Sequence, residues 1–285
     1  MRVGTPLLLL SLTRALTAQE PGTSGPPQAT SPTPQAAALP AFTLTLGAGV
    51  FAGPKYIGSD ETRVLPLPLV GVGYKNRVFL GASPSGAGAG IGVNLIKNRR
   101  VTLTAGLGGS EPRPEDRADA LAGMEDRRLG FAAVSGLSYQ LGPLSAGFTV
   151  SAGLRDNAGL TGTGNLGLTV PVTRRMFLSL GGNLTVANRD AMFFEFGITP
   201  VEAQRRANLI AGGDARLRTG DGVAYSPKGG VRDVGATSTL VYMLSSKWSL
   251  FGFGGVTRLS DEAARSSLVR RRSAWTTGAG ITVAL

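Results

Sequence analysis

Apolar residues alternate with small or polar residues along most of the chain from Ala41 onward, and no other feature constrains the fold as strongly. In residues 42–50, Phe, Leu, Ala and Val occupy every second position, and Thr or Gly stands between them. The same alternation returns in residues 101–108, 144–151, 176–184 and 280–285. Successive side chains of a β-strand point to opposite faces of a sheet, so a period of two predicts strands.

The face opposite the apolar residues is unusual for a soluble sheet, because it carries mostly Gly, Ser, Thr and Asn instead of Lys and Glu. Such small groups can fill the narrow lumen of a barrel, and the strands recur along the whole length, as a closed barrel requires. No apolar run reaches the ~20 residues of a membrane-spanning helix. The 42 glycines disfavour a long helical bundle, because glycine is costly inside helices. Residues 41–285 are therefore predicted to form an all-β, antiparallel transmembrane β-barrel.

The lengths of the connections predict the topology of this barrel. Short connections are expected near residues 75–76, 97–99, 142–143, 173–175 and 245–247, and long ones near residues 53–62, 110–127, 188–230 and 260–272. Two shorter outer loops, near residues 84–87 and 156–161, complete an alternation that predicts about twelve strands, with ten as the alternative. Bacterial barrels have short periplasmic turns and long outer loops. Residues 188–230 must then lie outside, with a hairpin expected at residues 208–218.

The first forty residues have the composition of an export signal followed by a linker. Arg2 supplies a positive start, residues 6–12 form a short apolar core, and Leu16, Thr17 and Ala18 form a cleavage site, so residues 1–18 are expected to be a signal peptide. Residues 19–40 are rich in Pro, Gly, Ser and Ala and show no periodicity, so we expect a disordered linker. The expected location of the protein is the cell outer membrane.

The composition argues against several kinds of chemistry. The chain has no Cys and no His, so it lacks disulfides, thiolate metal ligands and the commonest general base. No pair of acids falls within a plausible lumen, and we expect no enzymatic activity and no catalytic, cofactor-binding or metal-binding residues. The formal net charge is +11, but the Arg residues are scattered and no aromatic platform accompanies them. We therefore expect membrane lipid, and no nucleic acid, as a partner.

Two segments resemble binding loops. The run from Gly86 to Gly92 fails the spacing of a nucleotide-binding loop, because Ile91 stands at the third glycine position, so a glycine-rich strand is expected. Acidic residues cluster in a single loop, where calcium is conceivable, but their spacing is not that of an EF-hand and we expect a solvated outer loop. These acids are Glu111, Glu115, Asp116, Asp119, Glu125 and Asp126.

Arginines and prolines mark two further positions. Arg270, Arg271 and Arg272 could bind the phosphates of lipopolysaccharide through bidentate contacts, although a solvated loop end at the membrane interface is the simpler interpretation. Pro66 and Pro68 interrupt strand pairing, so they are expected to mark an edge or a bulge of the second strand. A role of these prolines in recognition is the alternative.

Four groups of residues occur in order across residues 41–285. The first is Tyr56, Ile57, Gly58, Ser59 and Asp60, followed by residues 63–70; the second is Phe196, Gly197, Ile198, Thr199 and Pro200 with Glu202 and Ala203. The third is residues 230–234 with Tyr242 and Trp248, and the fourth is Arg258, Leu259, Ala263, Ala264, Ser266 and Val269. Together they resemble the signatures of the MltA-interacting protein family, also called MipA/OmpV. The chain departs from the family at Ser267, where Pro is usual, at Arg265, where an acid is usual, and around residues 210–222, which look inserted.

The resemblance implies an outer-membrane barrel that acts as a scaffold. In that role it would link a murein lytic transglycosylase with a bifunctional murein synthase, and lipopolysaccharide or other membrane lipid would surround it. A small-solute, porin-like channel and a surface adhesin that uses the long loops are the alternatives. No motif in the residues themselves chooses among the three.

Overall fold

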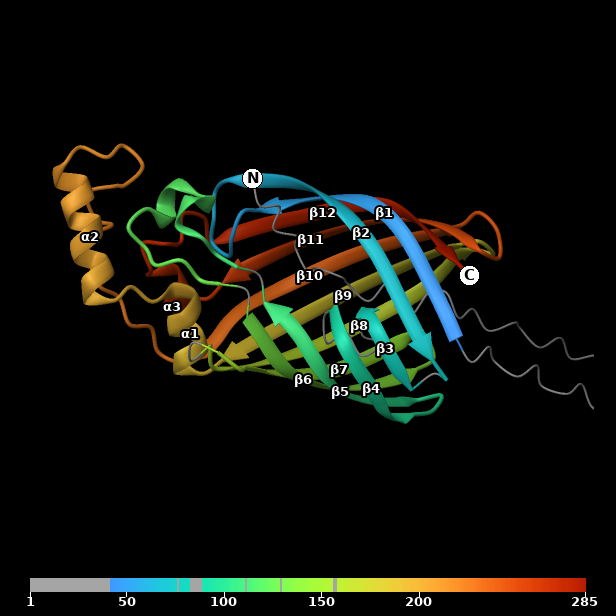
Figure 1. Ribbon diagram of the computed structural model, residues 1–285. Helices are drawn as coiled ribbons and strands as arrows, with labels where there is room; N and C mark the ends of the chain where they lie inside the picture. Colours follow the sequence, from blue (N-terminus) through green and yellow to red (C-terminus); the bar gives the residue numbers. More distant parts are fainter. Residues whose placement is uncertain (1–41, 76, 83–88, 111, 129, 156–157) are drawn as a thin grey trace, which may run out of the picture.

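The computed structural model describes residues 42–75, 77–82, 89–110, 112–128, 130–155 and 158–285. Within these residues, twelve strands form one closed barrel in which neighbouring strands run antiparallel (Figure 1). The predicted antiparallel barrel is therefore confirmed with twelve strands, and the ten-strand alternative is wrong. The expected signal peptide and linker, residues 1–40, lie outside the described residues.

The strands follow one another around the barrel in chain order, and β12 closes the ring against β1. They are β1 (Phe42–Pro54), β2 (Thr62–Tyr74), β3 (Val78–Ala82), β4 (Ala89–Lys97), β5 (Val101–Ser110), β6 (Gly130–Leu141), β7 (Leu144–Gly153), β8 (Leu160–Thr173), β9 (Met176–Ala187), β10 (Gly230–Met243), β11 (Trp248–Leu259) and β12 (Ser273–Ala284). The end of the glycine-rich run lies in β4, as expected of a strand, and the rest of the run falls outside the described residues.

The alternation in the sequence separates an outer face from an inner one. Large apolar side chains remain exposed on the outside of the barrel, among them Leu46, Val64, Leu107, Leu166 and Val256. Between them, small or polar residues face inward; Thr104, for example, is almost fully buried. An apolar outer band with a polar interior is the pattern of a barrel that sits in a bilayer, where lipid takes the place of a second sheet. The structure is an outer-membrane-type barrel.

All short turns lie at one end of the barrel and all long loops at the other (Figure 1). The turns after β2, β4, β6, β8 and β10 share the end where β1 begins and β12 finishes. The long loops follow β1, β5, β9 and β11 at the opposite end. The expected grouping of the five short turns on the side of the chain ends is confirmed. We call these two sides the turn end and the loop end.

Pro66 and Pro68 lie within β2, which pairs with β1 on one side and with β3 on the other. β2 pairs with β1 along its full length without a register shift, but within the described residues it pairs with β3 only through residues 72–74. The Tyr74 carbonyl accepts the Arg77 N–H on this second side of β2. Backbone polar groups point to alternate sides of a strand, so the nitrogens of Pro66 and Pro68 point to the same side as the Tyr74 carbonyl. The expected bulge is not observed between β2 and β1, and the expected edge is not tested, because the positions that would lie opposite Pro66 and Pro68 on the other side fall outside the described residues. Each proline also removes a backbone donor that lipid could not satisfy.

The long loops contain helices that the alternation did not predict. They are α1 (Arg189–Phe196), α2 (Pro200–Ala211), α3 (Asp261–Ala264) and two 3-10 turns, η2 (Glu115–Arg117) and η3 (Asp119–Leu121). The hairpin expected at residues 208–218 is wrong, because α2 continues to Ala211. Thr199 and Glu202 form a reciprocal capping box around Pro200, which fixes the start of this helix. No helix in the described part of the chain is long and apolar enough to cross a membrane.

Candidate functional site

The long loops pack together into a folded cap at the loop end (Figure 1). A shared apolar core joins Tyr56 from the β1–β2 loop, Leu121 from the β5–β6 loop, Ile198 from the β9–β10 loop and Leu268 from the β11–β12 loop. In the ring of twelve strands, the β5–β6 and β11–β12 loops arise from opposite sides. Loops from opposite sides can share one core only by meeting across the mouth of the barrel. The cap, defined as these four loops, therefore extends across the mouth.

Hydrogen bonds over large distances in sequence tie the cap loops to one another. The Tyr56 hydroxyl donates to the carbonyl of Leu268 at 2.6 Å. The Ser266 hydroxyl donates to the carbonyl of Phe196 at 2.7 Å. Gly58 has a φ of 95°, and the Val269 side chain lies 3.0 Å from the place where a Cβ would stand, so a larger residue does not fit there.

The groups of residues that carried the family resemblance thus meet in space. Tyr56 and Gly58 belong to the first group, Phe196 to the second, and Ser266 and Val269 to the fourth. In the structure these residues contact each other within the cap. The resemblance is therefore, in large part, a resemblance in how the cap is built.

Arg206 stands at the centre of the cap and is fully buried. Its guanidinium donates to the carbonyls of Ala120 and Ala122, both at 2.9 Å, and to the carbonyl of Asp221 at 2.8 Å. Those three carbonyls come from two different loops, so one side chain fixes the position of both. Burial lowers the pKa of Arg206, and the nearby Asp221 carboxylate opposes this shift. A buried charge of this kind must be compensated, and the carbonyls and the carboxylate do so.

Two buried carboxylates complete the polar interior of the cap. Burial by itself raises the pKa of Asp221, but the Arg270 guanidinium and the Arg218 backbone N–H outweigh it and hold the pKa below its usual range. Glu202 is also buried, and hydrogen bonds from the Thr199 backbone and hydroxyl and the Glu125 backbone N–H outweigh burial and lower its pKa. Both groups are therefore charged parts of the folded cap.

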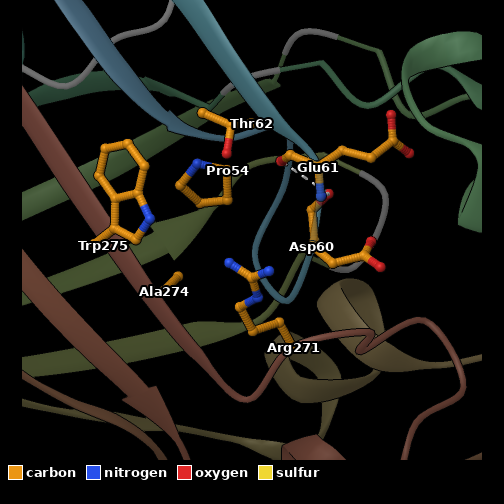
Figure 2. A pocket seen from close by; sticks show the side chains of 8 residues that line it. Pro54, Asp60, Glu61, Thr62, Arg271, Ala274 and Trp275 are labelled. Carbon is orange, nitrogen blue, oxygen red and sulfur yellow. Dashed lines mark hydrogen bonds between the residues drawn. The ribbon is translucent and has the colours of Figure 1, made fainter.

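The side chains of Arg270, Arg271 and Arg272 lie in three different environments, so they do not form a single phosphate-binding site. Arg270 is buried in an ion pair with Asp221, and Arg272 pairs with Asp261 at 2.5 Å. Figure 2 shows Arg271 beside Asp60 in a pocket that Trp275 lines from the other side. The cavity that these residues line measures about 10 Å³, which is room for about one water. The structure thus brings no three-arginine site together for lipopolysaccharide.

Three acids of the β5–β6 loop, Glu115, Glu125 and Asp126, also make contacts within the cap, whereas Glu111 lies outside the described residues. The Glu115 carboxylate accepts the Gly123 N–H at 2.7 Å, and Asp126 accepts the Glu115 N–H at 2.7 Å. Glu125 pairs with Arg205 on the surface. Among the residues that the structure describes, no group of three or more acids is arranged to hold a metal ion.

The inside of the barrel is divided between an apolar and a polar wall. On the apolar wall, the ring of Phe253 stacks with those of Phe51 and Phe251, at centroid distances of 6.4 and 6.5 Å. These rings pack with Leu67, Leu69 and Val241 into a buried cluster. We expected small residues to fill the lumen. Large side chains fit here because Gly278 and Gly280 leave space for the rings of Phe253 and Phe251 on the neighbouring strand, and Gly53 leaves space for the ring of Phe51 on its own strand.

The polar wall is made by the strands from β4 to β9. Hydroxyl and amide side chains point inward from it, for example Thr163, Asn165 and Asn183, which are half-buried. Thr163 and Thr185 lie within hydrogen-bond distance of each other, at 3.3 Å. The side chains on the inward face of the strands carry no formal charge in this middle part of the barrel. The lumen can therefore hold water along one wall and is packed along the other.

The turn end carries a large excess of positive charge. Its exposed basic residues are Lys75, Arg77, Lys97, Arg99, Arg100, Arg174, Arg175 and Lys247. Every Asp and Glu of the described residues lies in the loops of the loop end or, as with Asp233, on the adjoining part of a strand. The side chains of the turn end thus carry a formal charge of +8, out of +11 for the whole chain. The sequence already indicated part of this segregation, because the five predicted turns share one side and Lys75, Lys97, Arg174 and Lys247 lie in or beside them.

Solved structures with a related architecture include an outer-membrane channel from Pseudomonas putida F1 and the KdgM porin. The channel is 9% identical to this chain, covers 90% of it and 100% of its own length, and aligns with a TM-score of 0.41. The KdgM porin is 10% identical, with coverages of 84% and 98% and a TM-score of 0.40. Likenesses at this level say nothing about function.

The match to a protein family is more informative. A comparison with curated proteins found no match. The family model described as MltA-interacting protein MipA, however, matches residues 46–284, from within β1 to the end of β12. That span includes all four groups of residues that build the cap and the barrel wall. The chain belongs to the MltA-interacting protein MipA family.

Proposed function

We propose that this protein is a non-enzymatic scaffold in the outer membrane, exported by a signal peptide, that binds murein enzymes from the periplasmic side. The observation that carries the proposal is the cap, whose shared core lies across the mouth of the barrel. A barrel with a cap across its mouth and a lumen partly filled by Phe51, Phe251 and Phe253 is better suited to present surfaces than to pass solutes. The family name, which describes interaction with MltA, suggests a murein transglycosylase as one partner.

The orientation of the barrel decides which surface can meet such a partner. Outer-membrane barrels have short turns in the periplasm and long loops outside. By this rule the cap faces away from the cell, and the turn end faces the murein layer. The uncharged β6–β7 turn, Gly142 and Pro143, is exposed at this end and can be modified without altering its charges.

Photo-crosslinking in living cells tests the scaffold. A benzophenone amino acid at Pro143 is expected to capture a murein lytic transglycosylase or a bifunctional murein synthase. The matched control places the same group at Thr219, which is also exposed but lies in the cap, and no capture of these enzymes is expected there. Capture of the murein enzymes only from Thr219, or from neither position, would contradict the proposal.

A small-solute channel is the second candidate, and the polar wall favours it. The hydroxyl of Thr149 on this wall is buried without a hydrogen-bond partner from the protein, so water in the lumen could satisfy it. Conductance in planar bilayers separates the two functions. The scaffold predicts no steady current, whereas stepwise openings that persist in the folded, capped protein would favour the channel.

A further inference from the structure

The basic residues of the turn end lie next to outward-facing aromatic residues, and this pairing repeats around the rim. Lys75 follows Tyr74, and its Nζ lies 5.3 Å from the centre of that ring. Lys247 directly precedes Trp248, at the β10–β11 turn. Both aromatic side chains are exposed on the outside of the barrel.

Two further pairs are formed between neighbouring strands. Tyr139 lies opposite Val101, the residue after Arg100. Tyr242 lies opposite Met176, the residue after Arg175. Tyr139 and Tyr242 are also exposed on the outside. Four of the five turns thus carry a basic residue immediately beyond an aromatic one.

This arrangement fixes the depth of the charges in the membrane. Tyr and Trp on the outside of barrels form girdles at the level of the lipid headgroups. A cation one step beyond the girdle lies at the depth of the headgroup phosphates. Lys and Arg near an anionic membrane surface are attracted to it, and the attraction falls off within a Debye length.

From these observations we infer that the turn-end rim is a binding surface for anionic phospholipid headgroups, such as phosphatidylglycerol, in the leaflet around it. The ring form of the charge distribution favours lipid over an acidic protein. A docked protein would use one side or the centre of this end, whereas lipid surrounds the barrel and can meet the cations at all four turns. The inference needs only a barrel in a bilayer, and it stands independently of the murein partners.

The pairs of arginines at the β4–β5 and β8–β9 turns are the best positions for a variant that tests this inference. Arg99→Gln, Arg100→Gln, Arg174→Gln and Arg175→Gln together remove half of the formal charge of the turn end. The matched control makes four Arg→Gln substitutions at exposed cap residues, Arg205, Arg216, Arg218 and Arg265. A second turn-end variant, Lys75→Gln, Arg77→Gln and Lys247→Gln, serves if the first does not fold. Heat-modifiable migration in electrophoresis reports folding of each protein.

The experiment reconstitutes each full-length protein in phosphatidylcholine vesicles that contain spin-labelled phosphatidylglycerol or spin-labelled phosphatidylcholine. Electron paramagnetic resonance then gives the fraction of each label held at the protein surface. The native protein is expected to prefer phosphatidylglycerol about fivefold in low salt. High salt and the turn-end variants are expected to reduce this preference to near one, and the cap variant is expected to keep it. Inorganic phosphate added at constant ionic strength is expected to leave the preference for phosphatidylglycerol unchanged, because the surface binds headgroups that are held in a leaflet.

Equal association of the two labelled lipids with the native protein would overturn the inference. Loss of the preference in the cap variant, with retention in a folded turn-end variant, would overturn it as well. If no lipid preference exists and the same turn-end substitutions abolish capture of a murein enzyme from Pro143, the cations serve an acidic protein surface instead. Failure of the murein capture alone leaves the measured lipid preference as it is, so the two proposals fail separately.

Discussion

The hydroxyl of Tyr56 donates a hydrogen bond to the carbonyl of Leu268, 212 residues further along the chain. This contact joins the first long loop of the barrel to the last, because β1 and β12 are neighbours in the ring. Both residues are buried in the apolar core that also includes residues from the two other cap loops. The closure of the barrel between β1 and β12 is therefore stabilised by a contact between loops as well as by strand pairing.

Tyr56→Phe is expected to loosen the cap without unfolding the barrel. The substitution leaves the buried Leu268 carbonyl without its donor, at a cost of about 1 kcal/mol. Hydrogen–deuterium exchange should then rise in the β1–β2 and β11–β12 loops and stay unchanged in the strands. Tyr74→Phe, at the turn end, is the control and should leave exchange in the cap at its native level. Equal exchange in native and Tyr56→Phe proteins would show that the bond does not hold the loops.

Arg206→Met should have a larger effect, because it removes the donor to three buried carbonyls and leaves Asp221 with one cation fewer. Breaking a buried, compensated charge costs about 3–5 kcal/mol. Trypsin is expected to cut the loops of the variant rapidly while the barrel still migrates as a folded species. Arg205→Met is the neighbouring control, since Arg205 makes an exposed ion pair with Glu125, worth at most about 1 kcal/mol. Equal resistance of the two variants to trypsin would refute the central role of Arg206.

Acid should open the cap. The pKa values of Asp221 and Glu202 are lowered in the folded protein, so these carboxylates stabilise the cap above their unfolded values, near pH 4. That stabilisation is lost as the pH falls from there through the lowered pKa values. Digestion by pepsin across pH 5 to pH 2 should cut the cap loops increasingly below pH 4. Asp221→Asn should be cut already at pH 5, and a native cap that resists pepsin down to pH 2 would contradict the expectation.

Gly280→Ala tests the packing inside the barrel. A Cβ at Gly280 would lie 2.5 Å from the Ala48 carbonyl oxygen and 2.6 Å from the ring of Phe251, so strand and ring must both move. Overpacking of this kind costs about 1–3 kcal/mol. The midpoint of urea unfolding in detergent or vesicles should fall. At Gly164 a Cβ meets no atom within 4 Å, so Gly164→Ala is the matched control and should be close to neutral. A shared midpoint for the two variants would mean that the ring cluster is not tightly packed.

Much of the barrel could be predicted from the sequence because a strand that faces lipid on one side must alternate. Phe42, Leu46 and Val50 had to share a face with period two, and only a closed barrel satisfies the backbone of such strands in a membrane. The grouping of the short turns at one end followed from the even number of strands. The packing of the lumen did not follow, because alternation gives the face of Phe51 and Phe251 but not whether the opposite glycines leave them room.

The structure of the cap could not be predicted from the alternation of side chains, because its loops are held by contacts between segments that are distant in the sequence. Nothing near Arg206 in the sequence indicates that its partners are Ala120 and Ala122. One local signal was available: Thr199, Pro200 and Glu202 have the spacing of a capping box and mark the start of α2. The positive charge of the turn end, in contrast, could be predicted in part, because the even number of strands places Lys75 and Lys247 on the same side of the barrel.

The orientation of the capped barrel is the central claim, and labelling of single cysteines in intact cells tests it most directly. The chain has no native Cys, so a membrane-impermeant maleimide reports only the introduced residue. Thr219→Cys in the cap and Asn98→Cys in the β4–β5 turn are both exposed positions at opposite ends of the barrel. We predict labelling at Thr219→Cys alone in intact cells, and at both positions after the cells are lysed. Labelling at Asn98→Cys but not at Thr219→Cys in intact cells would invert the topology and contradict the account.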